Sequence, residues 1–324
     1  MMKKIVFICV GGVFAGLISS PYVSASEIAS AAINGKDIAA FSQGTKVNLG
    51  APEYDWWYGC SPTAAGMMMG YYDRNGYKGL SYQKLVPGAQ AEMSTFNSTP
   101  GVWQYNVQSI MASKGHVADF YNNGYLASND DKYTGRAFDS LADFMGTSQD
   151  ATQNVNASTT FWNYTDGSKL ALSDMYLLGS SYYNRSGMYG MWEYFQYAGY
   201  GSGSLSQQNI YNQLIYGYNN NKLGFTFDDY RAEIDAGRVV MIHVEGHSML
   251  GFGYDDAGKQ ILLNDTWSPG THSMTWGGTY SGLKQFGVTV FEPTGGSPVP
   301  LPGTSLLLVS GVVGLLGVRG RKAA

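Results

Sequence analysis

The sequence predicts an α+β fold, with helices in the first part of the chain and an antiparallel sheet in the last third. Residues 60–72 carry apolar side chains at helical spacing, whereas residues 239–264 contain three short strand-like runs separated by turn residues. The chain has 324 residues, which is enough for one large domain or two ordinary ones. Gly251 and Gly253 lie within an expected strand and open no helix, so they form no nucleotide-binding fingerprint.

The first predicted helix starts at Cys60 and runs to about Tyr72. Its first turn contains Pro62, which is tolerated there because the missing N–H would be unpaired in any case. Turn residues at 73–76 end the helix. The other helical patterns cover residues 102–113, 136–144 (ending at Gly146), 210–218 and 228–236.

The predicted strands are residues 239–244, 249–254, 260–264 and 288–291. Turns at 245–246 and 255–258 join the first three of them into an antiparallel meander. We expect residues 26–50 to be irregular or strand-like. Residues 147–205 are rich in Tyr, Asn and Gly, and we expect loops and short strands there. This segment reads as a long insertion, either a satellite core under loops or a binding wall for an extended ligand.

Both ends of the chain are predicted to be targeting segments that lie outside the domain. The domain then spans residues 26–294. Residues 1–25 are typical of a signal peptide, because Lys3 and Lys4 precede an apolar run and small residues offer a cleavage site near Ala25. Residues 295–324 form a linker, a Pro-rich motif, a short apolar segment and a basic end. The apolar segment is shorter than the roughly 20 residues of a free-standing membrane span.

The order of segments in this tail resembles the PEP-CTERM sorting signals of Gram-negative bacteria. The motif here reads Val-Pro-Leu-Pro-Gly at residues 299–303, a variant of the Val-Pro-Glu-Pro of those signals. The resemblance implies export, transient membrane anchoring through the tail, processing by exosortase-type sorting machinery and a location at the cell surface or outside the cell. A plain C-terminal anchor is the alternative.

Charge and cysteine content exclude two classes of site. Five of the 20 basic residues lie in the terminal segments, so the body carries 15 basic against 24 acidic residues and no basic stripe. This argues against a nucleic-acid partner. Removal of a signal peptide would take Cys9 with it and leave Cys60 as the single thiol, which excludes a zinc site built from several cysteines. The spacing of His and carboxylate residues indicates no metal site and no organic cofactor.

Cys60 is the candidate nucleophile. A thiol at a helix start faces unpaired backbone N–H groups and the positive end of the helix dipole, and both favour the reactive thiolate. Together with a protonated His247, the helix start is expected to hold the pKa of the thiol below the value of about 8.5 for a free thiol.

A base is also needed, and histidine is the usual one. His247 follows a turn and opens a strand, from which its ring can project into a cleft. His243 reads as a paired sheet residue, His116 as solvated and His272 as structural.

A third group should hold the imidazole of His247 in one tautomer. Asp265 follows the strand 260–264, and in a meander the end of this strand lies beside the start of the strand that carries His247. Contact between Asp265 and His247 is therefore permitted, with Asn264 as the adjacent competitor.

Three motifs in this order resemble those of peptidase C39-like members of the papain superfamily. They are YGCSPTAAG at 58–66, GHSMLGFGY at 246–254 and LND at 263–265. The family has a Cys-Gly-Pro-Thr-Ala type of helix start, a Gly-His strand and an Asn-Asp-Pro type of strand end. The resemblance implies a papain-like fold over roughly residues 40–294, with the nucleophile at a helix N-terminus packed on an antiparallel sheet. It implies Cys60 as nucleophile, His247 as general base and then acid, and Asp265 as orienter.

Two positions depart from the family pattern. Members commonly have a Gln a few residues before the Cys, which contributes to the oxyanion hole, but residues 53–57 (EYDWW) contain none. Loss of one such donor typically costs about 100- to 1,000-fold in rate. Thr266 stands where the family often has Pro.

We therefore expect an exported thiol hydrolase, a cysteine peptidase that acts on peptide or protein substrates. Two alternatives remain open. One is a catalytically inactive surface protein that binds peptide or extracellular polysaccharide, and the other is an amidase or acyl transferase that uses the same three residues.

Overall fold

The computed structural model describes residues 5–10, 44–54, 56–83, 85, 108–112, 140–149, 154, 156–201, 203–268 and 270–298. The α-helices are α3 (Cys60–Asn75), α4 (Gln108–Met111), α6 (Leu141–Met145), α7 (Leu172–Leu177), α8 (Ser180–Tyr183), α9 (Gly187–Tyr197) and α10 (Phe227–Asp235). The strands are β1 (Ile5–Val10), β2 (Thr45–Val47), β3 (Leu80–Ser81), β4 (Thr159–Tyr164), β5 (Leu170–Ala171), β6 (Asn209–Leu214), β7 (Val240–Val244), β8 (His247–Asp255), β9 (Gln260–Asn264), β10 (His272–Thr275), β11 (Thr279–Tyr280), β12 (Leu283–Glu292) and β13 (Ser297–Pro298).

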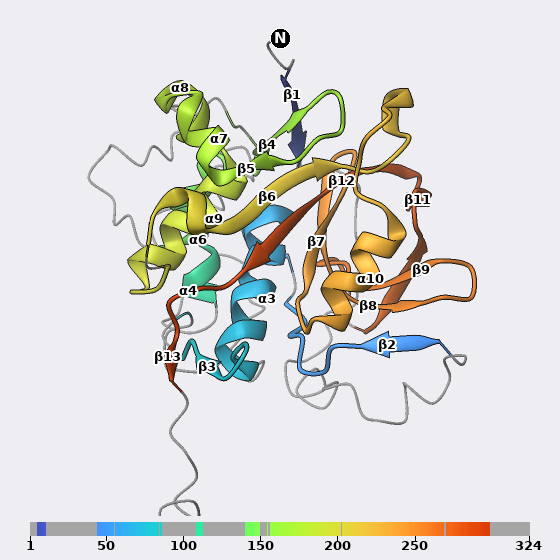
Figure 1. Ribbon diagram of the computed structural model, residues 1–324, viewed down its shortest axis with the longest axis horizontal. Coiled ribbons are helices and arrows are strands. Elements are labelled where there is room, and N and C mark those ends of the chain that lie inside the picture. The colour runs from blue at the N-terminus through green and yellow to red at the C-terminus, as the bar shows by residue number, and fades with distance from the viewer. Residues whose placement is uncertain are drawn as a thin grey trace, which may run out of the picture.

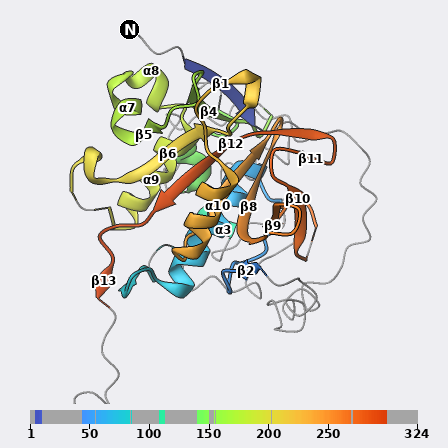
Figure 2. The same ribbon diagram turned by 45° about the vertical axis from the view of Figure 1, so that its right-hand side comes forward.

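One antiparallel sheet organises the molecule (Figure 1). Its strand order is β10-β9-β8-β7-β12-β6-β5, with β2 added beside β8 and β11 beside β12. Helix α3 packs on one face and α10 on the other (Figure 2). Strand β7 serves both faces, because Met241 belongs to the core on the α3 side, and Val240 and Ile242 to the core on the α10 side. The α+β class predicted from the sequence is therefore confirmed.

The C-terminal meander lies where the sequence predicts it, as β7, β8 and β9, with β12 completing the sheet. The predicted helix at 228–236 is also confirmed, as α10. The predicted helix at 210–218 is wrong, because residues 209–214 form strand β6 between β12 and β5. Both faces of β6 are covered, so five of its six residues are buried and the alternation that marks a half-buried strand is lost.

The segment 147–205 is more helical than expected. It contains β4 and β5, but also α7, α8 and α9, so the prediction of loops and short strands is wrong for these helices. In α9 the aromatic side chains Trp192, Tyr194 and Phe195 are buried in the main core, which favours a packing role for them over a binding wall. The described part of the helix predicted at 136–144 is α6, which ends at Gly146 in the left-handed conformation (φ 63°). Helix α4 lies within the range predicted at 102–113, most of which is outside the described residues.

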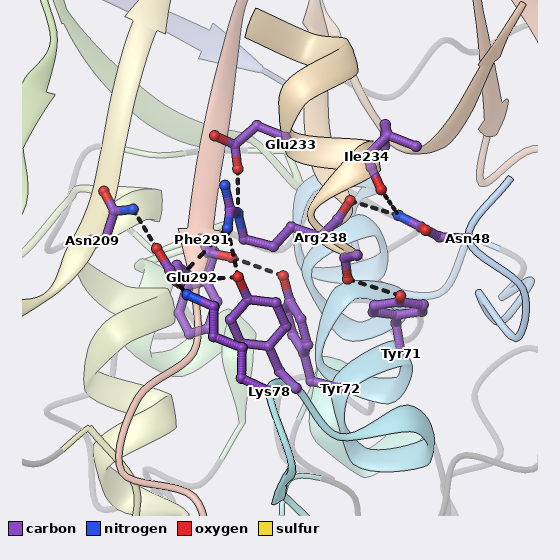
Figure 3. Close-up of polar contacts among 12 residues, drawn as sticks. Asn48, Tyr71, Tyr72, Lys78, Asn209, Glu233, Ile234, Arg238, Phe291 and Glu292 are labelled. Carbon is purple, nitrogen blue, oxygen red and sulfur yellow. Dashed lines mark hydrogen bonds and ion pairs between the residues drawn. The ribbon is translucent and has the colours of Figure 1, made fainter. Parts of the chain in front are cut away.

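A polar network fastens the C-terminal half of α3 to the sheet and to α10 (Figure 3). The Tyr72 hydroxyl donates to the carbonyl of Phe291 at 2.8 Å, and the Tyr71 hydroxyl donates to that of Gly237 at 2.9 Å. Beside them, the Glu292 carboxylate accepts from Lys78 at 2.6 Å and from Asn209 at 2.7 Å. The two tyrosine bonds hold the C-terminal half of α3 in place, and the other end of the helix carries Cys60.

The two ends of the described chain both pair with the domain. Strand β1 pairs with β4, and β13 pairs with β3. The cleavage expected near Ala25 and the sorting tail beyond residue 298 lie outside the described residues and stay predictions. Within the described ranges, no helix has the length and apolarity needed to cross a membrane.

Candidate active site

Cys60 is the first residue of α3, and its side chain is buried. The preceding residue must be glycine, because a Cβ on Gly59 would lie 2.8 Å from the carbonyl oxygen of Ala157. The Thr63 hydroxyl donates to the carbonyl of Gly59 at 2.7 Å and closes the first turn. The thiol is therefore held at the helix start by a tightly packed turn.

The hairpin β7–β8 brings His247 to the same place. Its turn contains Gly246 with φ 90°, and β8 begins at His247. The backbone N–H of the next residue, Ser248, donates to the Cys60 sulfur. Within the part of the chain that the structure describes, no hydrogen bond joins the sulfur to the His247 ring itself. Catalytic hydrogen bonds are often loose before substrate binds and tighten in the complex.

The His247 ring is held in one tautomer. Its Nε2 lies 2.6 Å from the carbonyl oxygen of Asp265, which can only accept, so Nε2 carries the proton in the neutral ring. The Nδ1 atom is then unprotonated and can act as a base. Trp267 stacks on the ring with a centroid distance of 3.7 Å and an interplanar angle of 20°.

Asp265 meets His247 through its backbone, not through its carboxylate. The carboxylate oxygen Oδ1 accepts from the amides of Trp267 and Ser268 at 2.8 and 2.9 Å, and Oδ2 accepts from the Tyr280 hydroxyl at 2.7 Å. The carboxylate therefore shapes the loop after β9 and places Trp267 over the imidazole. The predicted contact between Asp265 and His247 is present, but the orienting atom is the carbonyl oxygen.

The competitor Asn264 is engaged elsewhere, since its Nδ2 donates to the carbonyl of Pro52 at 2.8 Å. Thr266 has φ 65°, a left-handed conformation that is rare for a β-branched residue and closed to proline. The chain thus differs in backbone geometry, as well as in sequence, from a family member with Pro at this position.

Contacts across the site bind the residues before Cys60 to the loop after β9. The Trp56 amide donates to the carbonyl of Thr266 at 2.7 Å, and the Glu53 carboxylate accepts from the amide of Gly270 at 3.1 Å. Glu53 is thus used to hold this loop. The Cys60 amide is the oxyanion donor that the position of the thiol supports.

Burial sets the charges of the site. It raises the pKa of the Cys60 thiol to about 11, against the lowering effect of the Ser248 amide and the Ser61 hydroxyl. Burial also lowers the pKa of His247 to about 4. The resting site therefore holds a neutral thiol beside a neutral imidazole. The low thiol pKa expected from the helix start and a protonated His247 is wrong, because burial outweighs the helix start and keeps His247 neutral.

The other histidines have different surroundings. His272 is the first residue of β10, and its ring contacts the loop after β9: it lies 3.7 Å from the Asp265 carboxylate and bonds to Ser268. His116 lies outside the described residues. His243 is buried and bonded at both ring nitrogens, one of them to Ser248. The contact of His243 with Ser248 was not predicted, although the two-residue turn of the hairpin sets the two residues opposite each other.

These observations define the class: an α+β papain-like fold with a cysteine at a helix start, packed on an antiparallel sheet that carries the histidine. In agreement, residues 157–297 match the sequence model of the Peptidase_C39 like family. This match supports the C39-like family and covers β4 to β12, including His247 and Asp265. Cys60 lies before the matched residues, so its assignment depends on its position in the fold and on its sequence motif. No curated protein and no solved structure gives a significant match.

Proposed function

We propose that the protein is an exported cysteine peptidase, in which Cys60 is the nucleophile, His247 the general base and acid, and Asp265 the orienting residue. The family match supports a peptidase of this type. The observation that carries the proposal is the state of His247: the Asp265 carbonyl holds it with Nδ1 free to accept a proton, one residue before the amide that binds the Cys60 sulfur.

In the proposed reaction, His247 Nδ1 takes the thiol proton as the sulfur attacks the substrate carbonyl carbon. The developing oxyanion is bound by the Cys60 amide at the positive end of α3. His247 then returns the proton to the leaving amine, and a water molecule hydrolyses the thioester by the same steps in reverse. Because both groups are neutral at rest, proton transfer accompanies attack and does not precede it.

The test combines a thiol-directed active-site probe with cleavage of a peptide library. Wild-type protein should label at Cys60 and cleave peptides, whereas Cys60→Ala should lose both activities and keep its fold. His247→Ala should lose about 100- to 10,000-fold in kcat/KM, the usual contribution of a general base. His272→Ala is the matched control, because its ring contacts the same loop without reaching the thiol, and it should stay within about threefold of wild type.

One observation favours the non-catalytic alternative, a surface protein that binds peptide or polysaccharide. The thiol is buried and neutral. In the segment 147–205, by contrast, the side chains of Tyr176, Tyr182 and Tyr197 are exposed. An unlabelled Cys60 in a folded protein, together with binding of oligosaccharide or peptide that is lost in Tyr176→Ala, would establish this alternative. An amidase or acyl transferase would label at Cys60 but transfer the acyl group to an added amine or leave peptides uncut.

A further inference from the structure

The N-terminal strand β1 lies on the edge of β4. All six residues of β1 pair with β4 in antiparallel register, from Ile5 opposite Tyr164 to Val10 opposite Thr159. Figure 1 shows β1 at the top of the molecule, beside β4. Within the described residues, β1 is the one strand that forms a ladder with β4, because the only other bridge of β4 is an isolated one at residue 160. The backbone edge of β4 is therefore paired by a segment that is predicted to be cleaved.

A contact on the other side of β4 fixes the direction of its backbone groups. The carbonyl of Trp162 accepts from Nδ2 of Asn212 at 3.0 Å, and Asn212 lies on β6, so Trp162 turns its backbone groups away from β1. Backbone groups alternate in direction along a strand, so the N–H and C=O groups of Phe161 and Asn163 face β1. In the register of the pair, their hydrogen-bonding partners are residues 8 and 6.

Strand β4 leads to the thiol site. It begins at Thr159, two residues after Ala157, whose carbonyl oxygen lies 2.8 Å from the position of a Cβ on Gly59. Gly59 directly precedes Cys60. Because Val10 pairs with Thr159, the C-terminal end of a strand on this edge lies on the side of the thiol. The N-terminal end of that strand lies five residues further on, roughly 17 Å along the strand.

Cleavage near Ala25 would remove β1 and leave this edge open. Open donors and acceptors on the edge of a sheet bind an extended peptide through main-chain hydrogen bonds. Trp162 packs against Tyr182 at a centroid distance of 5.0 Å. A peptide residue opposite Trp162 lies on the same face of the pair, so we expect an apolar or aromatic residue to be preferred there. In the register of β1, this position is held by Phe7.

We propose that the edge of β4 is a peptide-binding site, which takes an extended peptide as an antiparallel strand with its C-terminal end directed towards Cys60. In the chain that keeps its leader, residues 5–10 hold this place. As a substrate site the edge rests on the proposed function, and it binds the residues that precede the scissile bond. The binding itself does not depend on catalysis.

The experiment compares exported protein, cleaved near Ala25, with the full chain that keeps residues 1–25. The probe is a synthetic peptide of residues 3–10 with Cys9→Ser, and the readout is hydrogen exchange of the Phe161 and Asn163 amides, resolved by mass spectrometry. At a peptide concentration ten times the Kd, these amides of the cleaved protein should exchange about tenfold more slowly. The full chain is the control, because β1 already occupies the edge, and the peptide should leave its exchange unchanged.

Methylation of the peptide backbone tests the register. N-methyl groups at Val6 and Ile8 remove the N–H groups that face β4 and should abolish the protection. N-methyl groups at residues 7 and 9 are the matched control, because they remove two N–H groups that point away from β4, and this peptide should protect as the parent does. In a peptidase assay, the protecting peptides at ten times the Kd should raise the apparent KM about tenfold and leave kcat unchanged.

A photo-crosslinker on the peptide tests the direction of binding. A benzophenone at the C-terminal end of the peptide should attach close to Thr159, and one at the N-terminal end should attach close to Tyr164. Mass spectrometry of the crosslinked fragments distinguishes the two positions. The reversed pattern would overturn the orientation towards Cys60.

Three other results would overturn the inference. The first is unchanged exchange of the Phe161 and Asn163 amides when the peptide is added to the cleaved protein. The second is equal protection by the two methylated peptides. The third is exported protein that keeps residues 5–10, because its edge would stay occupied.

The outcomes also separate this inference from the proposed function. Protection by the peptide in a protein without peptidase activity would support the inference and count against the proposed function. Peptidase activity in a protein that shows no protection would reject the inference alone. A protecting peptide that leaves the KM unchanged would overturn the role of the edge as a substrate site.

Discussion

Substitution of Asp265 tests how the imidazole of His247 is held. Asp265→Asn leaves the backbone carbonyl in place, so the 2.6 Å bond to Nε2 should persist. The Asn side chain can still accept from the Trp267 and Ser268 amides, but as a neutral group. Charge-assisted hydrogen bonds exceed neutral ones by roughly 1 kcal/mol each, so we expect a loss of about 1 to 3 kcal/mol in unfolding free energy.

Activity should follow the carbonyl and not the charge. We expect kcat/KM of Asp265→Asn to stay within about tenfold of wild type, which corresponds to about 1.4 kcal/mol in the barrier. Asp265→Ala also keeps the carbonyl but frees the loop that stacks Trp267 on His247, and should lose about 100-fold. Peptide hydrolysis measures the rates, urea unfolding the stability, and ¹⁵N NMR of the ring the His247 tautomer.

One outcome would refute this reasoning. If Asp265→Asn is folded and as inactive as Asp265→Ala, the carboxylate itself contacts the imidazole in the reacting enzyme. The Nε2–H signal of His247 provides the second criterion, since it should survive in Asp265→Asn whether or not a substrate has been found.

Three further predictions concern pH and the chain ends. Although burial raises the pKa of Glu292, hydrogen bonds from Lys78 and Asn209 hold it at about 2, so the carboxylate stabilises the fold above its unfolded pKa of about 4.5. Glu292→Gln should therefore cost roughly 1 to 2 kcal/mol at pH 7 after solvent screening, and urea unfolding should show this difference vanish as pH falls from about 4.5 to 2. The acid limb of kcat/KM should lie near pH 4, where His247 protonates, and a limb near 6.5 would contradict its burial. Deletion of residues 299–324 should leave the thermal midpoint unchanged, whereas deletion of residues 295–324 also removes β13 and should lower it. A lower midpoint after deletion of 299–324 alone would mean that these residues belong to the fold.

The sheet that carries the site could be predicted because its signals are local. Short turns at 245–246 and 255–258 separate runs of β-branched and apolar residues, and antiparallel pairing then fixes which residues are neighbours. Strand β6 was not predicted from the sequence, because both its faces are covered and because Asn212 and Gln213 break the apolar run. Helix α9 was not predicted either, because its aromatic and glycine residues have low helix propensity. Packing in the core, and not local preference, stabilises this helix.

In the candidate site, too, local pairing could be predicted from the sequence, whereas contacts that depend on tertiary packing could not. The meander places the end of β9 beside the start of β8, so the neighbourhood of Asp265 and His247 follows from register. Which atom of Asp265 reaches the ring does not follow from register. It depends on the left-handed backbone of Thr266 and on the hydrogen-bond partners of the carboxylate. The contact between Ser61 and Ser248 does not follow from register either, because it needs the packing of α3 on the sheet.

The state of the thiol depends on two opposing effects whose magnitudes only the fold reveals. A helix start and amide donors favour the thiolate, and the helix dipole typically contributes about 0.3 to 2 kcal/mol. Burial opposes them, and the net rise of the Cys60 pKa from 9.0 to about 11 corresponds to about 3 kcal/mol in favour of the thiol. A sequence displays the helix start but not the burial, so it predicts the smaller effect. A hydrolase with this site must form its nucleophile during attack, which makes the free Nδ1 of His247 the decisive feature of the arrangement.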